Sequence, residues 1–318
     1  MYLGIDIGGT KCALVLGKKD GSIVRKVKFD TKDVQTTLEQ ILHTAAGLCQ
    51  ASPEAVESIG VSCGGPLDSR RGIILSPPNL PGWDRIAINR MLREATGIPA
   101  YLCNDANACA LAEWKYGAGV GTQNMIFLTF GTGMGAGLVL NGRLYSGTSD
   151  MAGEIGHVRM AAYGPVGYGK SGSFEGFCSG SGIAQIGKNT ALELFQQGKT
   201  CSFCESMDKM DGITAKSVAI AAREGHEDAV HVYDICAEKL GAGLSILVDV
   251  LNPERIVLGS IYMRDSALLA DRMQAVLKRE CLPLAYDAVQ VVPAKLEENI
   301  GDIAALTVAA EGKDWTEE

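Results

Sequence analysis

The sequence predicts an α/β protein built from two related lobes. Its 318 residues are more than one hydrophobic core usually serves, so a two-lobed body is expected. A strand, a glycine-rich turn and a second strand open the chain, and the same arrangement returns near residue 124. GGTKCALVL (8–16) and TGMGAGLVL (132–140) both lead from a glycine turn into a Leu-Val-Leu strand. This repetition indicates a duplicated fold.

The first half is expected to begin with a three-stranded antiparallel meander. Its strands are 2–6, 12–17 and 22–29, and Asp20-Gly21 is a typical turn pair. Apolar residues at helical spacing then predict a helix over 33–50. The remaining elements expected in this half are a strand at 57–63, a long loop at 64–83, a helix near 86–96, a strand at 100–104 and a helix at about 106–116.

The second half is expected to be richer in helix. The elements predicted are strands at 124–130 and from 138, mostly helix from about 179 to 250, a strand at 255–260, a helix near 265–280, a strand at 288–294 and a helix at 301–311. We place the first lobe at 1–118 and the second at 119–296. The C-terminal helix, about 297–318, is expected to pack on the first lobe.

Composition narrows the possible partners and location. The net charge of −8 and the lack of a basic run disfavour nucleic-acid binding. No signal peptide and no membrane span are found, so no membrane partner is expected. Most of the ten cysteines stand in apolar runs, which is typical of buried thiols in a reducing cytoplasm. Cys201 and Cys204 form a C-x-x-C without a second pair for zinc, which favours a solvent-side pair over a metal or redox site.

The stretch GPVGYGKS (164–171) matches the pattern of a phosphate-binding P-loop. A P-loop needs a helix directly after it, so that backbone N–H groups and the helix dipole face the phosphates. Gly172, Gly176, Gly180 and Gly182 stand where that helix would propagate, and each costs about 1 kcal/mol relative to alanine. We therefore expect a glycine-rich loop here and a phosphate site elsewhere.

Two glycine turns are better phosphate candidates. The first combines Gly8 and Gly9 with the Thr10 hydroxyl and the Lys11 cation, while Asp6 suits a Mg²⁺ ion carried on phosphates. An ordinary hairpin turn with a polar tip is the alternative, and it stays open. The second turn, FGTGMGAG (130–137), is followed by a strand and not a helix, which excludes a Rossmann dinucleotide loop. Two such turns could clamp one polyphosphate.

Other polar residues suit sugar chemistry. Asp105 follows a strand and opens a helix, so it can be an N-cap or a base that accepts a hydroxyl proton. Glu154 and His157, with Glu175 further on, can hold vicinal hydroxyls, or they can be structural loop residues. A rigid Pro-rich loop at 76–83 carries the amide of Asn79.

Taken together, these segments resemble the ROK family (repressor, open reading frame, kinase) over nearly the whole chain. The segments that match, in the family's order, are DIGGTK, PNLPGW, CNDANACALAEW, FGTGMGAG, GEIGH and NPERIVLGS. The resemblance implies an actin-like ATPase fold with two ribonuclease-H-like lobes and a central cleft. It also implies an ATP- and Mg²⁺-dependent hexose kinase.

By this resemblance Asp105 is the base for the sugar 6-hydroxyl, and Asp6 helps to place Mg²⁺, through water. The residues implied to hold the sugar are Gly65, Asn79, Asn104, Asp105, Glu154, His157 and Glu175. Those implied to hold ATP are Gly8, Gly9, Thr10, Lys11, Thr132, Gly133, Gly259 and Ser260. The family usually has glycine at position 260, so the serine is a departure.

A second departure concerns the zinc knuckle that many members of the family carry. Aligned on Glu175, its three cysteine positions are Val166, Tyr168 and Ser173 here. A closed zinc site needs four ligands, so no zinc is expected. Packing through Tyr168 and Phe174 is then expected to hold the loop, which leaves His157 to serve the sugar.

The resemblance makes a sugar kinase the leading hypothesis and a sugar-binding regulator without kinase activity the alternative. Family repressors carry a helix-turn-helix ahead of the kinase-like body, and here the first phosphate hairpin starts by residue 4, which leaves no room for one. Glucose and N-acetylmannosamine are the leading substrates. Gly64-Gly65 would leave space for a substituent on the sugar's second carbon. A homodimer is implied by the resemblance alone.

Overall fold

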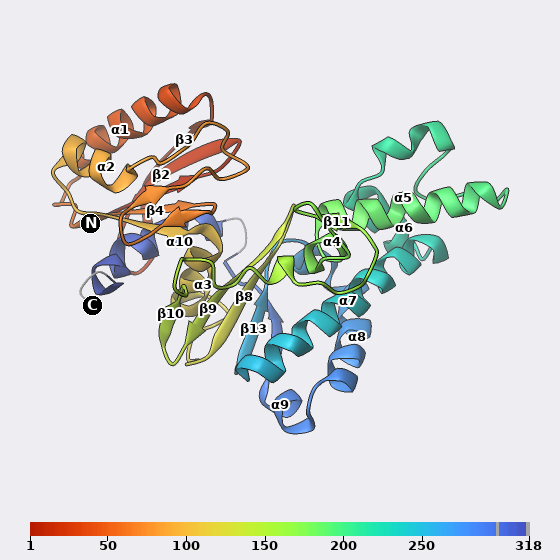
Figure 1. Cartoon of the computed structure of the whole chain (residues 1–318). Coiled ribbons are helices and arrows are strands. Elements are labelled where there is room, and N and C mark those ends of the chain that lie inside the picture. Colours follow the sequence, from red (N-terminus) through yellow and green to blue (C-terminus); the bar gives the residue numbers. More distant parts are fainter. Residues whose placement is uncertain (297–298, 316–318) are drawn as a thin grey trace. The chain divides into compact units, whose positions relative to one another are not determined.

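The structure is a computed structural model that describes residues 1–296 and 299–315 (Figure 1). The chain forms two compact units. Unit 1 comprises Met1–Gln123, Gly137–Ala152 and the segment from Lys295, and unit 2 comprises Asn124–Ala136 and Gly153–Ala294. Residues 137–152, which the expected boundary assigned to the second lobe, therefore belong to the first unit.

Close packing on helix α3 (Asp105–Tyr116) explains this difference. A Cβ placed on Gly137 would lie 2.5 Å from both the Ala106 carbonyl oxygen and the Ala110 Cβ, so only glycine lets the chain approach the helix this closely. Gly142 then donates its N–H to the Gln123 carbonyl at 2.8 Å. The Gly137 contact fixes the segment against α3, and the Gly142 hydrogen bond ties it to Gln123 of the same unit.

Unit 1 contains one five-stranded sheet in the order β3-β2-β1-β4-β7. Its strands are β1 (Tyr2–Ile7), β2 (Lys11–Gly17), β3 (Ile23–Asp30), β4 (Ser58–Cys63) and β7 (Ala100–Asn104). Strands β1, β2 and β3 form the expected antiparallel meander, whereas β4 runs parallel to both β1 and β7. Every residue of β4 is buried, as is usual for an inner parallel strand covered on both faces.

The helices of unit 1 are α1 (Val34–Gln50), α2 (Ile88–Thr96), α3 and α10 (Ile300–Glu311), followed by a 3₁₀ turn over Gly312–Trp315. Helix α1 begins where predicted, because the Asp33 side chain accepts the Thr36 N–H as an N-cap. The segment 64–83, expected as loop, also contains a short hairpin of β5 (Leu67–Asp68) and β6 (Ile73–Ile74). Further along the same segment, Leu80 and Trp83 are fully buried in the core.

A second five-stranded sheet has the order β10-β9-β8-β13-β14. Its strands are β8 (Met125–Phe130), β9 (Met134–Leu140), β10 (Arg143–Tyr145), β13 (Arg255–Leu258) and β14 (Gln290–Pro293). Numbered within each sheet, both have the order third, second, first, fourth, fifth. In both, the third strand is antiparallel to the second, and the fourth is parallel to the first and the fifth. This common topology confirms the duplicated α/β fold.

Most of unit 2 is helical, as predicted. Its helices are α4 (Phe174–Phe177), α5 (Gly180–Gln196), α6 (Ala215–Arg223), α7 (Glu227–Leu251), α8 (Ile261–Glu280) and α9 (Pro283–Ala288), with 3₁₀ turns at Ile155–His157 and Met207–Gly212. A hairpin of β11 (Val166–Gly167) and β12 (Lys170–Ser171) precedes α4. None of the helices in the described part of the chain is long and apolar enough to cross a bilayer.

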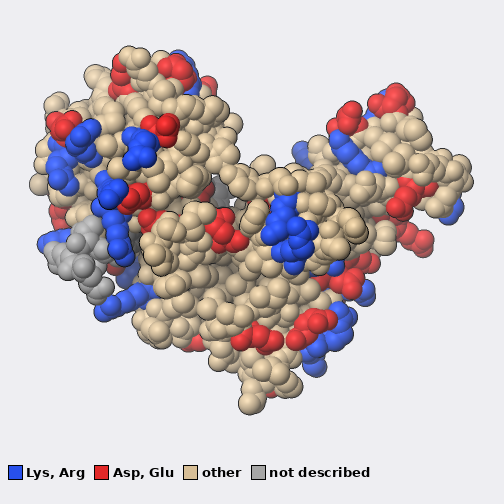
Figure 2. Space-filling model, in the orientation of Figure 1, with Lys and Arg blue, Asp and Glu red and all other residues tan. Residues whose placement is uncertain are grey.

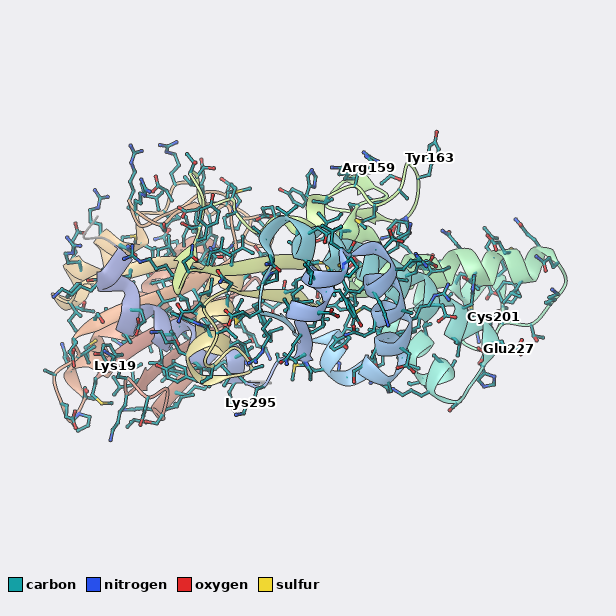
Figure 3. All side chains as sticks on the ribbon, turned by 90° about the horizontal axis from the view of Figure 1, so that it is seen from below. Lys19, Arg159, Tyr163, Cys201, Glu227 and Lys295 are labelled. Atoms are coloured by element: carbon teal, nitrogen blue, oxygen red, sulfur yellow. The ribbon has the colours of Figure 1, made fainter. Side chains whose placement is uncertain are left out.

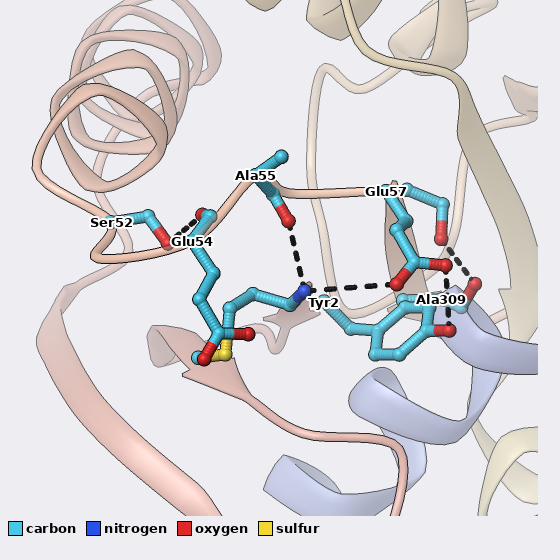
Figure 4. Close-up of polar contacts among 8 residues, drawn as sticks. Tyr2, Ser52, Glu54, Ala55, Glu57 and Ala309 are labelled. Carbon is cyan, nitrogen blue, oxygen red and sulfur yellow. Dashed lines mark hydrogen bonds and ion pairs between the residues drawn. The ribbon is translucent and has the colours of Figure 1, made fainter.

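Helix α10 packs on β1, β4 and α3 of unit 1. Two glycines make the approach possible: a Cβ on Gly4 would lie 2.7 Å from the Leu306 nitrogen, and one on Gly60 would lie 2.2 Å from the Ala309 nitrogen. The Ser58 hydroxyl donates to the Ala309 carbonyl at 2.5 Å, and nearby the Tyr2 hydroxyl donates to Glu57 at 3.0 Å (Figure 4). The sheet thus joins the two ends of the chain.

A buried carboxylate holds the chain where it returns to unit 1. Glu113 on α3 has no exposed surface, and its Oε1 accepts the N–H groups of Lys295 and Leu296 at 2.9 and 2.8 Å. Its Oε2 accepts the Ala118 N–H at 2.7 Å. Burying a carboxylate is costly unless it is fully hydrogen-bonded, and here both oxygens have donors.

Replacing Gly60 by alanine tests the packing of α10. We expect Gly60→Ala to lower the free energy of unfolding by about 1–3 kcal/mol, because the added methyl must displace helix backbone. Gly47→Ala is the matched control, since an added Cβ on that exposed residue of α1 meets nothing within 4 Å. It should stabilise by about 0.5–1 kcal/mol. Urea unfolding of both variants measures this, and equal effects would contradict the packing argument.

Candidate functional site

The first glycine turn of unit 1 joins β1 to β2 and presents a polar tip. Gly8 donates its N–H to the Lys11 carbonyl at 3.0 Å, which closes the turn. The Thr31 hydroxyl donates to the Gly8 carbonyl at 2.6 Å, and the Thr31 N–H donates to the Thr10 carbonyl at 2.9 Å. Gly9, Thr10 and Lys11 themselves are exposed. The turn is therefore held from behind while its donors face solvent.

Gly9 brings this turn against the loop that carries Asn79. A Cβ on Gly9 would lie 2.4 Å from the Asn79 carbonyl oxygen, so any larger residue would push the two segments apart. The Asn79 amide lies beside Gly64, whose added Cβ would be 3.3 Å from Asn79 Oδ1. A predicted phosphate turn and a predicted sugar residue thus lie side by side within unit 1.

Asn104 also lies on the glycine pair. A Cβ on Gly65 would be 3.3 Å from Asn104 Nδ2. The space beside Gly64 and Gly65, which the sequence suggested as room for a sugar substituent, is therefore bordered by the amides of Asn79 and Asn104. These amides can donate and accept hydrogen bonds, so the glycines serve to let polar groups approach the backbone.

Asp105 is the first residue of α3, and Asn104 is the N-cap. The Asn104 Oδ1 accepts the N–H groups of Ala106 at 3.0 Å and Asn107 at 3.3 Å. The interpretation of Asp105 as the cap is therefore wrong, although its Oδ1 also accepts the Ala106 N–H at 2.8 Å. Asp105 is an exposed residue. The surrounding protein nevertheless removes part of the solvation of its carboxyl group, and this desolvation raises the pKa of Asp105 above the usual value. Asp105 is therefore available to accept a proton.

Asp6 lies on β1 opposite Ser62 of β4. The pKa of Asp6 is raised to about 6, mainly by burial and also by the charges of Asp105 and Asp302, while a hydrogen bond with Ser62 and the charge of Lys26 act in the opposite direction. Lys26 forms an ion pair with Asp302, which is 5% exposed on α10. An added Cβ on Gly301 would lie 3.0 Å from Asp6 Oδ2. The sequence singled out Asp6 but not Ser62, Lys26 or Asp302, because these residues meet Asp6 only in the fold.

The flank of α3 forms one wall of a pocket of about 420 Å³ within unit 1. Asn104, Asn107 and Trp114 line it from α3 and its cap. The Asp150 carboxylate accepts the Ser69 N–H and hydroxyl, both at 2.8 Å, at the same pocket. Asn107 is 2% exposed, and its buried Oδ1 has no hydrogen-bond partner among the residues that the structure describes. Such an orphaned acceptor beside a polar pocket is unusual and indicates a place for a donor.

The second glycine turn, in unit 2, leaves β8 next to the start of α5. Gly180 donates its N–H to the Gly131 carbonyl at 2.7 Å, and the Ser181 hydroxyl donates to the Thr132 carbonyl at 3.3 Å. Thr132 is exposed and Gly133 is half-buried. The positive end of a 17-residue helix therefore lies at this turn, which favours a bound anion.

Glu175 joins the second glycine turn to the predicted sugar loop of unit 2. Its Oε2 accepts the Met134 N–H at 2.9 Å and would lie 2.7 Å from a Cβ on Gly133. A Cβ on Gly156 would in turn be 3.3 Å from the Glu175 Cβ and 2.2 Å from the Met134 carbonyl oxygen. One oxygen of Glu175 thus orders the turn. Glu154 and His157, on either side of Ile155-Gly156, are exposed.

The loop after His157 is held by backbone pairing and one buried ring. GPVGYGKS forms the hairpin of β11 and β12, and the helix that follows it in the chain is the single turn α4, so the segment lacks P-loop architecture. Phe174 is fully buried, as expected of a residue that holds the loop, but Tyr168 is 71% exposed, so the expectation that it packs in the loop is wrong. In the described ranges no three His, Cys, Asp or Glu residues are grouped to hold a metal. The absence of zinc remains a prediction.

Ser260 follows β13 and precedes α8 with φ +49° and ψ −105°, a conformation that disfavours a side chain. A Cβ on Gly131 would lie 3.5 Å from Ser260 Oγ. The two predicted nucleotide segments of unit 2 are neighbours because β8 and β13 are parallel, so both segments leave the sheet at the same edge.

Comparison with known proteins identifies the family. The model of the ROK family matches residues 2–311. The chain belongs to the ROK family. A glucokinase of Halalkalibacterium halodurans is 32% identical over 95% of this chain and 92% of its own length. The ROK glucokinase of Streptomyces griseus, solved with glucose and AMPPNP, superposes with a TM-score of 0.78 at 28% identity and covers 98% of this chain and 99% of its own. A xylose repressor of Caldicellulosiruptor bescii is 25% identical over 93% of this chain and 74% of its own length.

The raised pKa of Asp6 makes the stability of this ROK protein depend on pH. Between about pH 4 and 6 folded Asp6 keeps a proton that the unfolded chain has released, so its contribution to stability is lost as pH rises through this range. We expect Asp6→Asn to be more stable than the wild type by on the order of 1–3 kcal/mol at pH 8 and by much less at pH 4. Denaturant unfolding at both pH values measures this. A difference that does not change with pH would contradict the assignment.

The backbone of Ser260 predicts a second stability effect. Ser260→Gly should raise the free energy of unfolding by about 1 kcal/mol, because glycine adopts this backbone conformation without strain. Ser260→Ala keeps a Cβ and should give no gain, so it serves as the control. Thermal unfolding of the two variants distinguishes them, and equal midpoints would show that the backbone at 260 is not strained.

Proposed function

We propose that this chain, a sugar kinase of the ROK family that uses ATP with Mg²⁺, transfers the terminal phosphoryl group to the 6-hydroxyl of a hexose or N-acetylhexosamine. Glucose and N-acetylmannosamine are the leading substrates. The observation that carries this proposal is that the N-cap of α3 and the candidate base are two different residues. Asn104 caps the helix, so the exposed Asp105 carboxylate is available as a base.

Asp105 accepts the proton of the sugar hydroxyl as its oxygen attacks phosphorus. Its raised pKa makes it a stronger base than an ordinary aspartate. The amides of Asn79 and Asn104 lie in the same unit beside Gly64 and Gly65, and we assign them to orient the sugar. Orientation of the hydroxyl and electrostatic stabilisation supply most of the catalysis in phosphoryl transfer.

The two glycine turns suit the phosphates of ATP. Gly9, Thr10 and Lys11 offer exposed donors and a cation in unit 1, and Gly8, which is half-buried, closes the turn. In unit 2, Thr132 and Gly133 lie at the N-terminus of α5, with Gly259 and Ser260 on the neighbouring strand end. We assign Asp6 to hold Mg²⁺, through water, and the bound ion would neutralise phosphate charge. The raised pKa of Asp6 fits a carboxylate whose charge a cation would stabilise.

The remaining residues proposed for the sugar come from unit 2. Glu175, Glu154 and His157 are assigned to the hydroxyls, and Glu175 uses its second oxygen because the first accepts Met134. A homodimer and a cytoplasmic location are the expected setting, with no nucleic-acid or membrane partner. In the view of Figure 2, acidic and basic side chains form small groups separated by uncharged surface, which suits a small-molecule enzyme.

A sugar-responsive regulator is the second candidate, because a xylose repressor is among the relatives. A regulator needs sugar binding but no base. Release of ADP from MgATP in the presence of a panel of hexoses, 2-acetamido sugars and ketoses separates the two functions. Turnover with one sugar supports the kinase and names its substrate. Sugar binding without turnover by any member of the panel would favour the regulator.

Replacing the proposed base tests the mechanism. Asp105→Asn should lower kcat by about 10²–10⁴-fold and still bind sugar, because the Asn104 cap keeps α3 in place. Asp20→Asn is the control, since it removes an exposed carboxylate in the turn between β2 and β3. Steady-state kinetics and sugar calorimetry give the readouts. Near-normal turnover of Asp105→Asn would refute the base assignment.

A further inference from the structure

The turn of the β11–β12 hairpin carries an aromatic residue in an unfavourable conformation. Gly167 pairs with Lys170, so Tyr168 and Gly169 form a two-residue turn. Their φ angles are +43° and +73°, as in a type I′ turn. Asn-Gly and Gly-Gly are preferred in such turns, and positive φ is uncommon for a bulky side chain. Tyr168 therefore does not favour this turn.

The hairpin does not need the Tyr168 ring for its own stability. The Val166 N–H donates to Gln185 Oε1, and Gln185 Nε2 donates to the Val166 carbonyl, both at 2.9 Å. The Ser171 hydroxyl donates to the Gly164 carbonyl at 2.9 Å. Phe174 is fully buried against Gly243 of α7, where an added Cβ would lie 2.2 Å from the ring. Tyr168 itself stays 71% exposed.

The side chains of this turn instead meet His157. The rings of Tyr168 and His157 are 6.3 Å apart between centroids and 73° between planes, an edge-on contact. Lys170 Nζ donates to the His157 carbonyl at 2.7 Å. The hairpin thus contacts both the ring and the backbone of a residue proposed to bind the sugar.

We propose that Tyr168 is a specificity-determining residue that contacts the sugar beside the hydroxyls bound by His157. A strained, exposed aromatic residue costs stability and is retained where it serves a ligand. A tyrosine ring offers an apolar surface for the C–H face of a pyranose and a hydroxyl for its polar substituents. This inference rests on the proposed function, since it deepens the same sugar site.

Tyr168→Asn removes the ring and creates the Asn-Gly pair that a type I′ turn prefers, so the variant should fold at least as well as the wild type. We expect the KM and Kd for the sugar to rise about fivefold or more, while kcat and the KM for ATP stay within about twofold. Tyr168→Phe should keep most of the affinity. The order of the sugars by Kd should also differ between Tyr168→Asn and the wild type.

Tyr163→Asn is the matched control. Tyr163 is an 87% exposed tyrosine of the same loop, and its side chain extends outward in Figure 3 near Arg159. The Tyr163→Asn variant should leave the KM for the sugar unchanged. Wild-type sugar affinity and ranking in Tyr168→Asn, or an equal rise in the KM for ATP, would overturn the inference. Calorimetry measures the Kd for the sugar without turnover. A wild type that binds sugar but shows no turnover would therefore refute the kinase function, and the Kd of Tyr168→Asn would still test the role of Tyr168.

Discussion

The packing of α10 on the central strands of unit 1 is the constraint on which much of this protein depends. Residues from the two ends of the sequence meet there, since Gly4 and Gly60 let the helix backbone approach β1 and β4 directly. Close contact of backbone with backbone leaves little freedom for small shifts, because protein interiors are packed as densely as crystals. The position of β1, and with it the first glycine turn, is therefore set by the C-terminal helix.

The same packing creates an electrostatic cost. It places Asp302 and Gly301 of α10 near Asp6. The charge of Asp105 also raises the pKa of Asp6. Lys26 neutralises Asp302 but does not restore an ordinary pKa to Asp6. A group of carboxylates without enough cations is destabilising by itself and becomes favourable when a bound cation enters. The protein thus gives up stability in its free form where the proposed reaction needs negative charge.

The duplicated topology gives each unit a turn with exposed donors but different supports. In unit 1 the turn is held by Thr31 and by the loop at Asn79. In unit 2 it is held by Glu175 and by the start of α5. The second set also orders residues next to the proposed sugar loop. Changes at Glu175 are therefore expected to affect the proposed phosphate turn as well as the proposed sugar binding, since Glu175 orders the turn and is assigned to the sugar.

The sequence by itself determined most of the strands and helices, the repeated glycine turns and the family, because these follow from periodicity, glycine placement and motif order, whereas the short hairpins β5–β6 and β11–β12 were expected to be loop. It also indicated Asp105, Asn79 and His157, whose residue types suit sugar and phosphate chemistry. Only the tertiary structure decided that Asn104 caps α3, that residues 137–152 belong to unit 1, that Tyr168 is exposed and that Asp302 and Lys26 lie near Asp6. Neighbouring residues can exchange the role of cap, and contacts between distant segments depend on how closely elements pack, which no local pattern encodes.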